Sequence, residues 1–123
     1  MVIITILNAF RRRRFVRPPL AAIACLILAT PARAAVEPEF GTTLEGHRFT
    51  PSEIRIPANV KVRLVIDNRD ASAEEFDSHA LNREKVVPAK SKVTLFIGPL
   101  APGRYPFIGE FNAATAHGEV VAQ

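Results

Sequence analysis

The sequence predicts an all-β domain, an antiparallel sandwich or barrel, that follows an export signal. Two observations predict the β domain: apolar and polar residues alternate in several short runs, and clusters of Pro, Gly, Asn and Asp separate these runs. A further observation supports this class: no long run with a helical period follows the predicted signal. With 123 residues, the chain has room for one small domain.

Alternation with a period of two identifies the strands, because successive side chains of a strand point to opposite faces of a sheet. The inward-facing residues of four runs are Ile54 and Ile56; Val60, Val62, Leu64 and Ile66; Val93, Leu95 and Ile97; and Tyr105 and Phe107. Val120 and Val121 mark a closing strand, and residues 70–85 form the least strand-like and most acidic stretch. We expect Phe76, Tyr105, Phe107 and Phe111 in the core, since aromatic residues of strands usually pack there.

The N-terminus has the composition of a removable export signal. Arginines at 11–14 and 17 precede an apolar run at 20–29, and the small residues Ala32 and Ala34 suit a signal peptidase. We predict a signal peptide at 1–34 and one domain at 35–123. A retained N-terminal anchor is the alternative, although the apolar run is short for a membrane span of about 20 residues. Residues 12–17 (RRRFVR) resemble a twin-arginine signal, and ordinary secretion remains equally open.

Removal of the signal changes both charge and chemistry. The signal contains Met1, Cys25 and six arginines but no acidic residue, so the remaining chain has no sulfur and is slightly acidic. The basic balance of the whole chain therefore gives no indication of nucleic-acid binding, and no interleaving of basic and aromatic residues suggests it. Any metal ion must be bound by oxygen and imidazole nitrogen.

The order of the predicted pieces resembles the cupredoxin fold, a Greek-key β-sandwich. Residues 49–58 look like its opening strand and turn, and residues 60–68 look like a core strand that ends on asparagine. Residues 100–107 look like the closing hairpin, and residues 118–121 look like the last strand. The resemblance covers nearly all of the chain from Phe40 onward.

Within that superfamily, the chain resembles the EfeO-type cupredoxin-like proteins that accompany bacterial iron permeases. Four segments carry this resemblance: 74–78 (EEFDS), 83–87 (REKVV), 96–100 (FIGPL) and 109–112 (GEFN). It implies a periplasmic protein that takes part in iron uptake. It also implies copper or iron as the bound metal, with oxidation of Fe(II) proposed for some members of that family.

The chain departs from ordinary cupredoxins at the copper ligands. Blue copper is bound by two histidines, a cysteine and a weak axial ligand that is commonly methionine. Glu74 or Glu75 stands near the first histidine, Gly109 or Glu110 near the cysteine, and Asn112 near the second histidine; Glu119 or His117 stands near the methionine. These departures exclude a blue-copper electron carrier.

The acidic segment 74–79 supplies the first candidate metal ligands. If Phe76 is buried in an extended segment, Glu74 shares its face, and Glu75, Asp77 and His79 lie on the opposite face. Carboxylates suit iron and other oxygen-preferring ions, and imidazole extends the range to copper and zinc. A solvated acidic loop without metal is the alternative.

Glu110 and His117 are the remaining candidates. Glu110 follows the strand after which the resemblance puts the metal-binding loop, and a buried carboxylate is costly unless it is paired or metal-bound. Its alternative is a surface acid or a partner of Arg104 or Lys85. His117 would complete a site with Glu110, although a lone loop histidine is more often solvated. We expect His47 to have only a local structural role.

Two functions follow. The first is a periplasmic metal-binding accessory of ferrous iron uptake, with copper or iron bound by Glu74, Glu75, Asp77, His79, Glu110 and His117. The second is a metal-free module that docks on an iron permease or on a periplasmic iron-binding protein, and so meets the membrane only through that partner. The sequence shows no nucleophile motif, phosphate-binding loop or hydrolase signature. Whether the protein oxidises Fe(II) stays open.

Overall fold

A computed structural model describes residues 32–123, and it is all-β apart from one short 3₁₀ helix, which confirms the predicted class. Most of the predicted signal peptide lies outside the described residues. Residues 34–123 form one compact unit. Its elements in chain order are β1 (Glu39–Glu45), β2 (Arg48–Thr50), β3 (Glu53–Ile56), β4 (Val62–Asn68), β5 (Glu74–Ser78), β6 (Arg83–Val87), β7 (Ser91–Ile97), β8 (Gly103–Gly109), η1 (Glu110–Asn112) and β9 (His117–Ala122).

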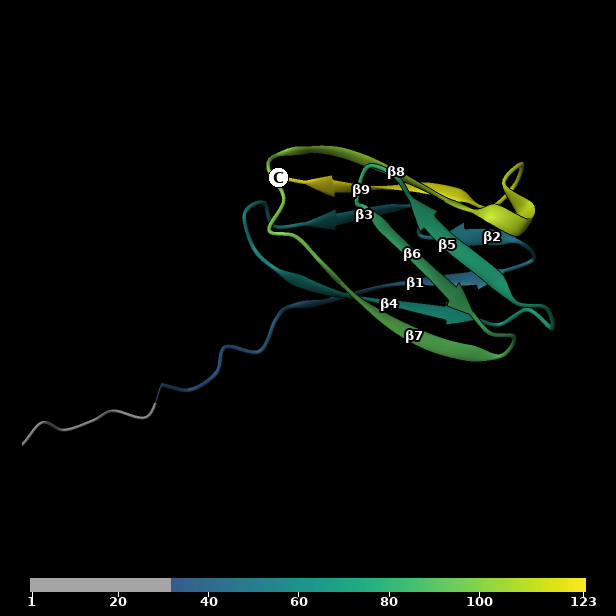
Figure 1. The fold of residues 1–123 in the computed structure, drawn as a ribbon, viewed down its shortest axis with the longest axis horizontal. Coiled ribbons are helices and arrows are strands. Elements are labelled where there is room, and N and C mark those ends of the chain that lie inside the picture. The colour runs from purple at the N-terminus through teal and green to yellow at the C-terminus, as the bar shows by residue number, and fades with distance from the viewer. Residues whose placement is uncertain (1–31) are drawn as a thin grey trace, which may run out of the picture. The chain divides into compact units, whose positions relative to one another are not determined.

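The strands form two sheets that face each other as a sandwich (Figure 1). One sheet has the order β2-β1-β4-β7, and the other has the order β3-β9-β8-β5-β6. Most neighbours are antiparallel as expected, but β1 pairs with β4 and β3 with β9 in parallel. The parallel pairs arise because the chain crosses between the sheets, so strands that are distant in sequence become neighbours.

The core lies between the sheets and is built by the alternation that the sequence shows. In β4, Val62, Leu64 and Ile66 are buried while the residues between them are half-buried. Val60 was expected to continue this inward row, but it is 38% exposed because it precedes the strand. The short, regular β4 therefore presents one apolar face to the opposite sheet.

Aromatic packing confirms part of the expected core and corrects part of it. Phe76 and Phe107 are buried, with ring centroids 4.9 Å apart. The ring centroids of Phe49 and Phe107 lie 5.0 Å apart in an edge-to-face arrangement. Tyr105 is half-buried against this cluster. Phe111 was expected in the core, but it is 55% exposed. It lies in η1, beyond the last buried position of β8, where strand alternation no longer applies.

The acidic stretch that looked least strand-like contains two strands, β5 and β6. They pair with each other antiparallel, and β5 also pairs with β8. Neighbouring strands therefore stabilise a segment whose own composition is poor for a strand, which is the usual way tertiary context overrides local propensity.

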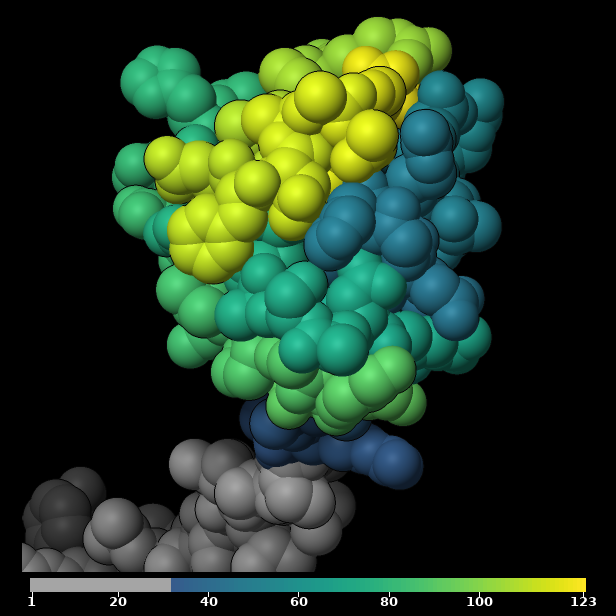
Figure 2. All heavy atoms as spheres, turned by 90° about the vertical axis from the view of Figure 1, so that its right-hand side faces the viewer, coloured from purple at the N-terminus to yellow at the C-terminus, as the bar shows by residue number. Residues whose placement is uncertain are grey.

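Several connections gather at one end of the sandwich (Figure 2), where η1 (yellow) lies beside residues of the β1–β2 turn (blue) and the β4–β5 loop (teal). The buried side-chain amide of Asn68 donates to the carbonyl oxygens of Ser72, Val87 and Pro88. The carboxylate of Asp70 accepts from the backbone N–H groups of Gly46 and His47. These bonds tie the loops of this end together.

Among residues 32–123, no helix has the length and apolar character that crossing a bilayer requires.

Candidate metal centre

Strand β5 separates its side chains into an inner and an outer set. Glu74, Phe76 and Ser78 are buried, whereas Glu75 and Asp77 are half-buried on the outer face of the five-stranded sheet. This is the alternation that the sequence predicts for an extended segment with Phe76 inside. The two carboxylates on the outer face are therefore next to solvent and to the neighbouring strand, β6.

Three carboxylates meet on this outer face. Asp77 lies opposite Glu84 of β6, so Glu84 is diagonal to Glu75, within reach of a long side chain. Glu110 begins η1 immediately after β8. One carboxylate oxygen from each of Glu75, Glu84 and Glu110 lies within 4.8 Å of the others. The three residues come from β5, β6 and the β8–β9 connection, so only the folded sheet brings them together.

Among residues 32–123, no ion pair neutralises this acidic face. In the described part of the chain, Glu75, Asp77, Glu84 and Glu110 have no Lys, Arg or His nitrogen within the 4.0 Å of an ion pair. Acidic residues elsewhere do have such partners. Arg104, for example, contacts both Glu53 and Glu119, and it forms no ion pair with Glu110, which was one of the alternatives for that residue.

The crowding of like charges changes the acidity of Glu75. The pKa of Glu75 rises from an ordinary 4.5 to about 7, chiefly because a hydrogen bond to Glu84 favours the protonated form. Desolvation acts in the same direction, as does repulsion from Glu84, Glu110 and Asp77. A cation would relieve the same repulsion by taking the place of the proton.

Glu74 has a different environment from Glu75. It is 1% exposed, and Oε1 accepts from the backbone N–H groups of Glu75 at 3.0 Å and Phe111 at 2.8 Å. Its Oε2 accepts from the side-chain amide of Asn112 at 2.8 Å. The carboxylate is thus buried and hydrogen-bonded at both oxygens, on the opposite side of β5 from the three-carboxylate group.

Gly109 leaves room for this buried carboxylate. A Cβ atom at position 109 would lie 2.7 Å from Cδ of Glu74 and 2.7 Å from Cβ of Ala116. Position 109 is one of the two at which the cupredoxin resemblance expects the cysteine. Here the space next to it is filled by Glu74.

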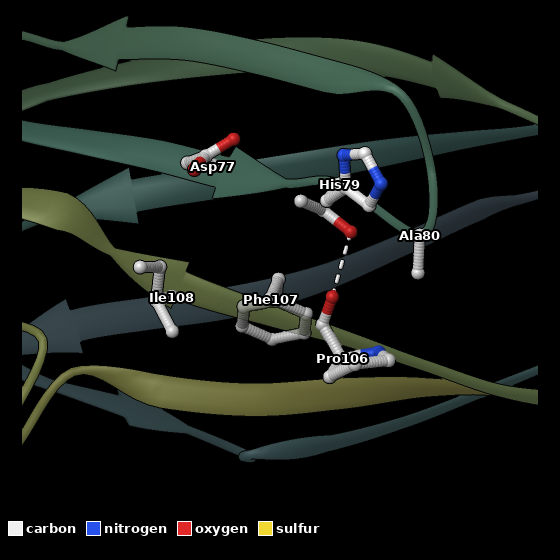
Figure 3. Close-up of a pocket in the computed structure, with 7 residues that line it drawn as sticks. Asp77, His79, Ala80, Pro106, Phe107 and Ile108 are labelled. Carbon is white, nitrogen blue, oxygen red and sulfur yellow. Dashed lines mark hydrogen bonds between the residues drawn. The ribbon is translucent and has the colours of Figure 1, made fainter.

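The group of three carboxylates does not include the two candidate histidines. His79 lines a surface hollow together with Asp77 and Glu84. His79 is exposed in the turn after β5, beside a hollow of about 310 Å³ where Ser78 Oγ donates to the carbonyl of Pro106 (Figure 3). His117 begins β9 and is paired with Ile108, which is in turn paired with Asp77. Two strand spacings, about 10 Å, therefore separate the backbones of His117 and Asp77.

Glu84 is the member of the three-carboxylate group that the sequence reasoning did not select. Its outward position follows from its place opposite Asp77, because paired residues of neighbouring strands point to the same face of a sheet. Its closeness to Glu75 depends on the register between β5 and β6. That register is not visible in the sequence.

Comparison with known proteins identifies the fold family. The profile of the Cupredoxin-like domain matches residues 19–122. An uncharacterised protein of Rickettsia prowazekii (strain Madrid E), RP394, is 39% identical over 83 residues, which cover 68% of this chain. The match spans 66% of that protein's length.

Solved structures with little sequence identity share the architecture. The metal-binding domain of the Cu(I)-exporting P-type ATPase CopA of Streptococcus pneumoniae D39 aligns with a TM-score of 0.62 at 11% identity, over 69% of this chain and 84% of that one. Auracyanin B also aligns at 0.62, with 15% identity, over 74% and 92% of the two chains. The chain belongs to the family of cupredoxin-like domains.

Proposed function

We propose that the protein works in the periplasm as a metal-binding accessory of ferrous iron uptake. In this proposal the carboxylates of Glu75, Glu84 and Glu110 bind iron or copper(II) on the outer face of the five-stranded sheet. The observation that carries the proposal is that three carboxylate oxygens lie within 4.8 Å of one another without a neutralising basic group among the described residues.

The donor set decides which metals suit this site. Three carboxylates and water form an oxygen-rich environment, which hard cations prefer, whereas Cu(I) prefers thiolate and thioether sulfur. The group therefore fits iron, and fits copper only as Cu(II). The protein's contribution is to bind and orient the ion through side chains of three separate elements.

A blue-copper centre does not fit these residues. Gly109 offers no side chain, a Cβ there would collide with Glu74, and the Glu74 carboxylate is already hydrogen-bonded to three N–H groups. Auracyanin A, a "blue" copper protein, shares the fold at 14% identity. That similarity supports a cupredoxin-like scaffold for the proposed site without supplying its ligands.

The iron-uptake part of the proposal is supported by the resemblance of segments 74–78, 83–87, 96–100 and 109–112 to EfeO-type proteins. Three of these segments contain the residues of the carboxylate group. The partner would be an iron permease or a periplasmic iron-binding protein.

Metal titration tests the binding proposal. Purified protein is titrated anaerobically with Fe(II) and separately with Cu(II), with bound metal quantified after gel filtration and Cu(II) examined by electron paramagnetic resonance. The variant Glu75→Gln/Glu84→Gln/Glu110→Gln should lose binding. A control with equal loss of charge, Glu37→Gln/Glu39→Gln/Glu45→Gln, should keep it. Equal uptake by the two variants would exclude the three-carboxylate site.

A metal-free docking module is the second candidate, and the exposed apolar residues Val86 and Phe111 favour it. They are 48% and 55% exposed, and they belong to β6 and η1, the elements that also carry Glu84 and Glu110. If docking is the function, Val86→Ser/Phe111→Ser abolishes iron-limited growth of the host while the triple Gln variant supports it. The metal-binding proposal expects the reverse.

A further inference from the structure

Glu74 connects the two backbone segments that carry Glu75 and Glu110. A single oxygen, Oε1, accepts from the N–H of Glu75 in β5 and from the N–H of Phe111, the residue directly after Glu110. These donors lie 36 positions apart in the sequence. One buried atom thereby joins β5 to η1 beside two of the three candidate ligands.

The second oxygen extends the connection along η1. Oε2 of Glu74 accepts from the side-chain amide of Asn112, the last residue of this short helix. A carboxylate that is 1% exposed is costly without such partners, and hydrogen bonds to a charged acceptor are among the stronger ones. The bonds are therefore strong enough to hold the position of η1, which has no buried residue of its own.

A backbone hydrogen bond also closes the loop that contains η1, next to Glu74. The N–H of Gly109 donates to the carbonyl of Ala116 at 2.7 Å, which brings the two ends of the β8–β9 connection together. A Cβ atom at position 109 would collide with the side chains of both Ala116 and Glu74. The small side chains at 109 and 116 thus form the space in which the carboxylate of Glu74 sits.

We propose that Glu74 is a positioning residue: its buried carboxylate holds η1 against β5 and so keeps Glu110 within reach of Glu75 and Glu84. Through its hydrogen bonds, the carboxylate cross-links strand β5 to the β8–β9 connection. This inference rests on the proposed function for its effect on metal binding, but the cross-link itself exists without metal.

Two substitutions at position 74 separate positioning from ligation. Glu74→Leu keeps most of the volume and removes both acceptors, so the N–H groups of Glu75 and Phe111 lose their partner. Glu74→Gln keeps one acceptor oxygen for these N–H groups. Its amide can donate to Asn112 after the Asn112 side chain turns by 180°, because the Asn112 Oδ1 has no other hydrogen bond in the described structure.

The first measurement needs no metal. Amide hydrogen exchange at Phe111, followed by nuclear magnetic resonance, should become at least about tenfold faster in Glu74→Leu and remain within about threefold of the parent protein in Glu74→Gln. The second measurement is the Fe(II) dissociation constant from anaerobic calorimetry. It should weaken by about 10–100-fold in Glu74→Leu, as for other residues that orient metal ligands, and remain within about threefold in Glu74→Gln.

Each result decides a different question. If Glu74→Gln loses as much Fe(II) affinity as Glu74→Leu, Glu74 is itself a ligand and the positioning role is wrong. If Glu74→Leu folds and keeps both parent values, the cross-link is unimportant. If the parent protein binds neither Fe(II) nor Cu(II), the proposed function fails, while exchange at Phe111 still tests the cross-link. Should Glu74→Leu not fold, Asn112→Ala removes one of the three bonds and should change both values in the same direction by a smaller factor.

Discussion

The side-chain amide of Asn112 donates to Oε2 of Glu74 across 2.8 Å, although the two residues are 38 positions apart in the chain. This bond joins a buried strand residue to the connection between β8 and β9. The bond holds η1, which contains Glu110, against β5. The stability of the domain should therefore depend on this bond.

Asn112→Ala should destabilise the domain by about 1–3 kcal/mol, because a buried carboxylate oxygen loses its partner. Chemical denaturation followed by circular dichroism measures the free energy of unfolding. Ala114→Gln in the same connection is the control, since Ala114 is exposed and should tolerate the change. Equal stability of Asn112→Ala and the parent protein would show that solvent replaces the amide.

Gly109→Ala should also destabilise, by about 1–3 kcal/mol, since the added methyl group overpacks the space around Glu74 and Ala116. Gly41→Ala provides the control. A Cβ at position 41 would meet only the carbonyl oxygen of Val65, at an ordinary 3.6 Å. Thermal and urea unfolding of both variants measure the difference, and equal effects would contradict the crowding at Gly109.

The unfolding free energy should depend on pH through Glu75. Its folded-state pKa is about 7 and its ordinary value is 4.5, so the folded state binds the proton more tightly. The resulting stabilisation is complete below pH 4.5 and is lost as the pH rises through 7. Urea unfolding between pH 4.5 and 8 should show a steeper fall for the parent protein than for Glu75→Gln.

Glu45→Gln controls for the loss of an exposed charge in this series, because Glu45 lies in β1, outside the acidic group. Its pH profile should follow the parent profile. A Glu75→Gln profile with the parent slope would mean that Glu75 titrates normally.

The two phenylalanines on either side of the β8–η1 boundary should differ sharply. Phe107 is 2% exposed and packs against Phe49 and Phe76, so Phe107→Ala should cost about 3–5 kcal/mol of unfolding free energy. Phe111 is 55% exposed, and Phe111→Ala should change stability by less than about 1 kcal/mol. Differential scanning calorimetry of the two variants measures both effects. A large loss at Phe111 would mean that it packs in solution as the sequence predicts.

Most strands of the sandwich could be predicted, because the alternation of buried and exposed residues in a strand appears within a few consecutive residues. The inward rows that end at Ile56, Ile66, Ile97 and Phe107 are each visible within a few residues. The strands of residues 70–85 were not visible, since their carboxylates resemble a solvated loop and their stability comes from pairing with β8.

For the candidate site, the sequence identified Glu75 and Glu110 but not their meeting with Glu84. Each of these residues belongs to a different element, and the register of β5 with β6 determines the diagonal contact. His79 and His117 were proposed with the same carboxylates; the three-carboxylate group does not include them, although His79 lines a surface hollow together with Glu84.

The sequence by itself determined a small β domain and showed that residues 35–123 contain no sulfur, which excludes copper bound by a thiolate of this domain. Residue types and their period of two are sufficient for these conclusions, because they depend on chemistry and on local backbone geometry. Only the tertiary structure decided that Glu74 turns inward to hydrogen-bond η1 while Glu75, Glu84 and Glu110 meet outside. The reason is that strand register and the path of the β8–β9 connection are set by packing between residues far apart in the chain.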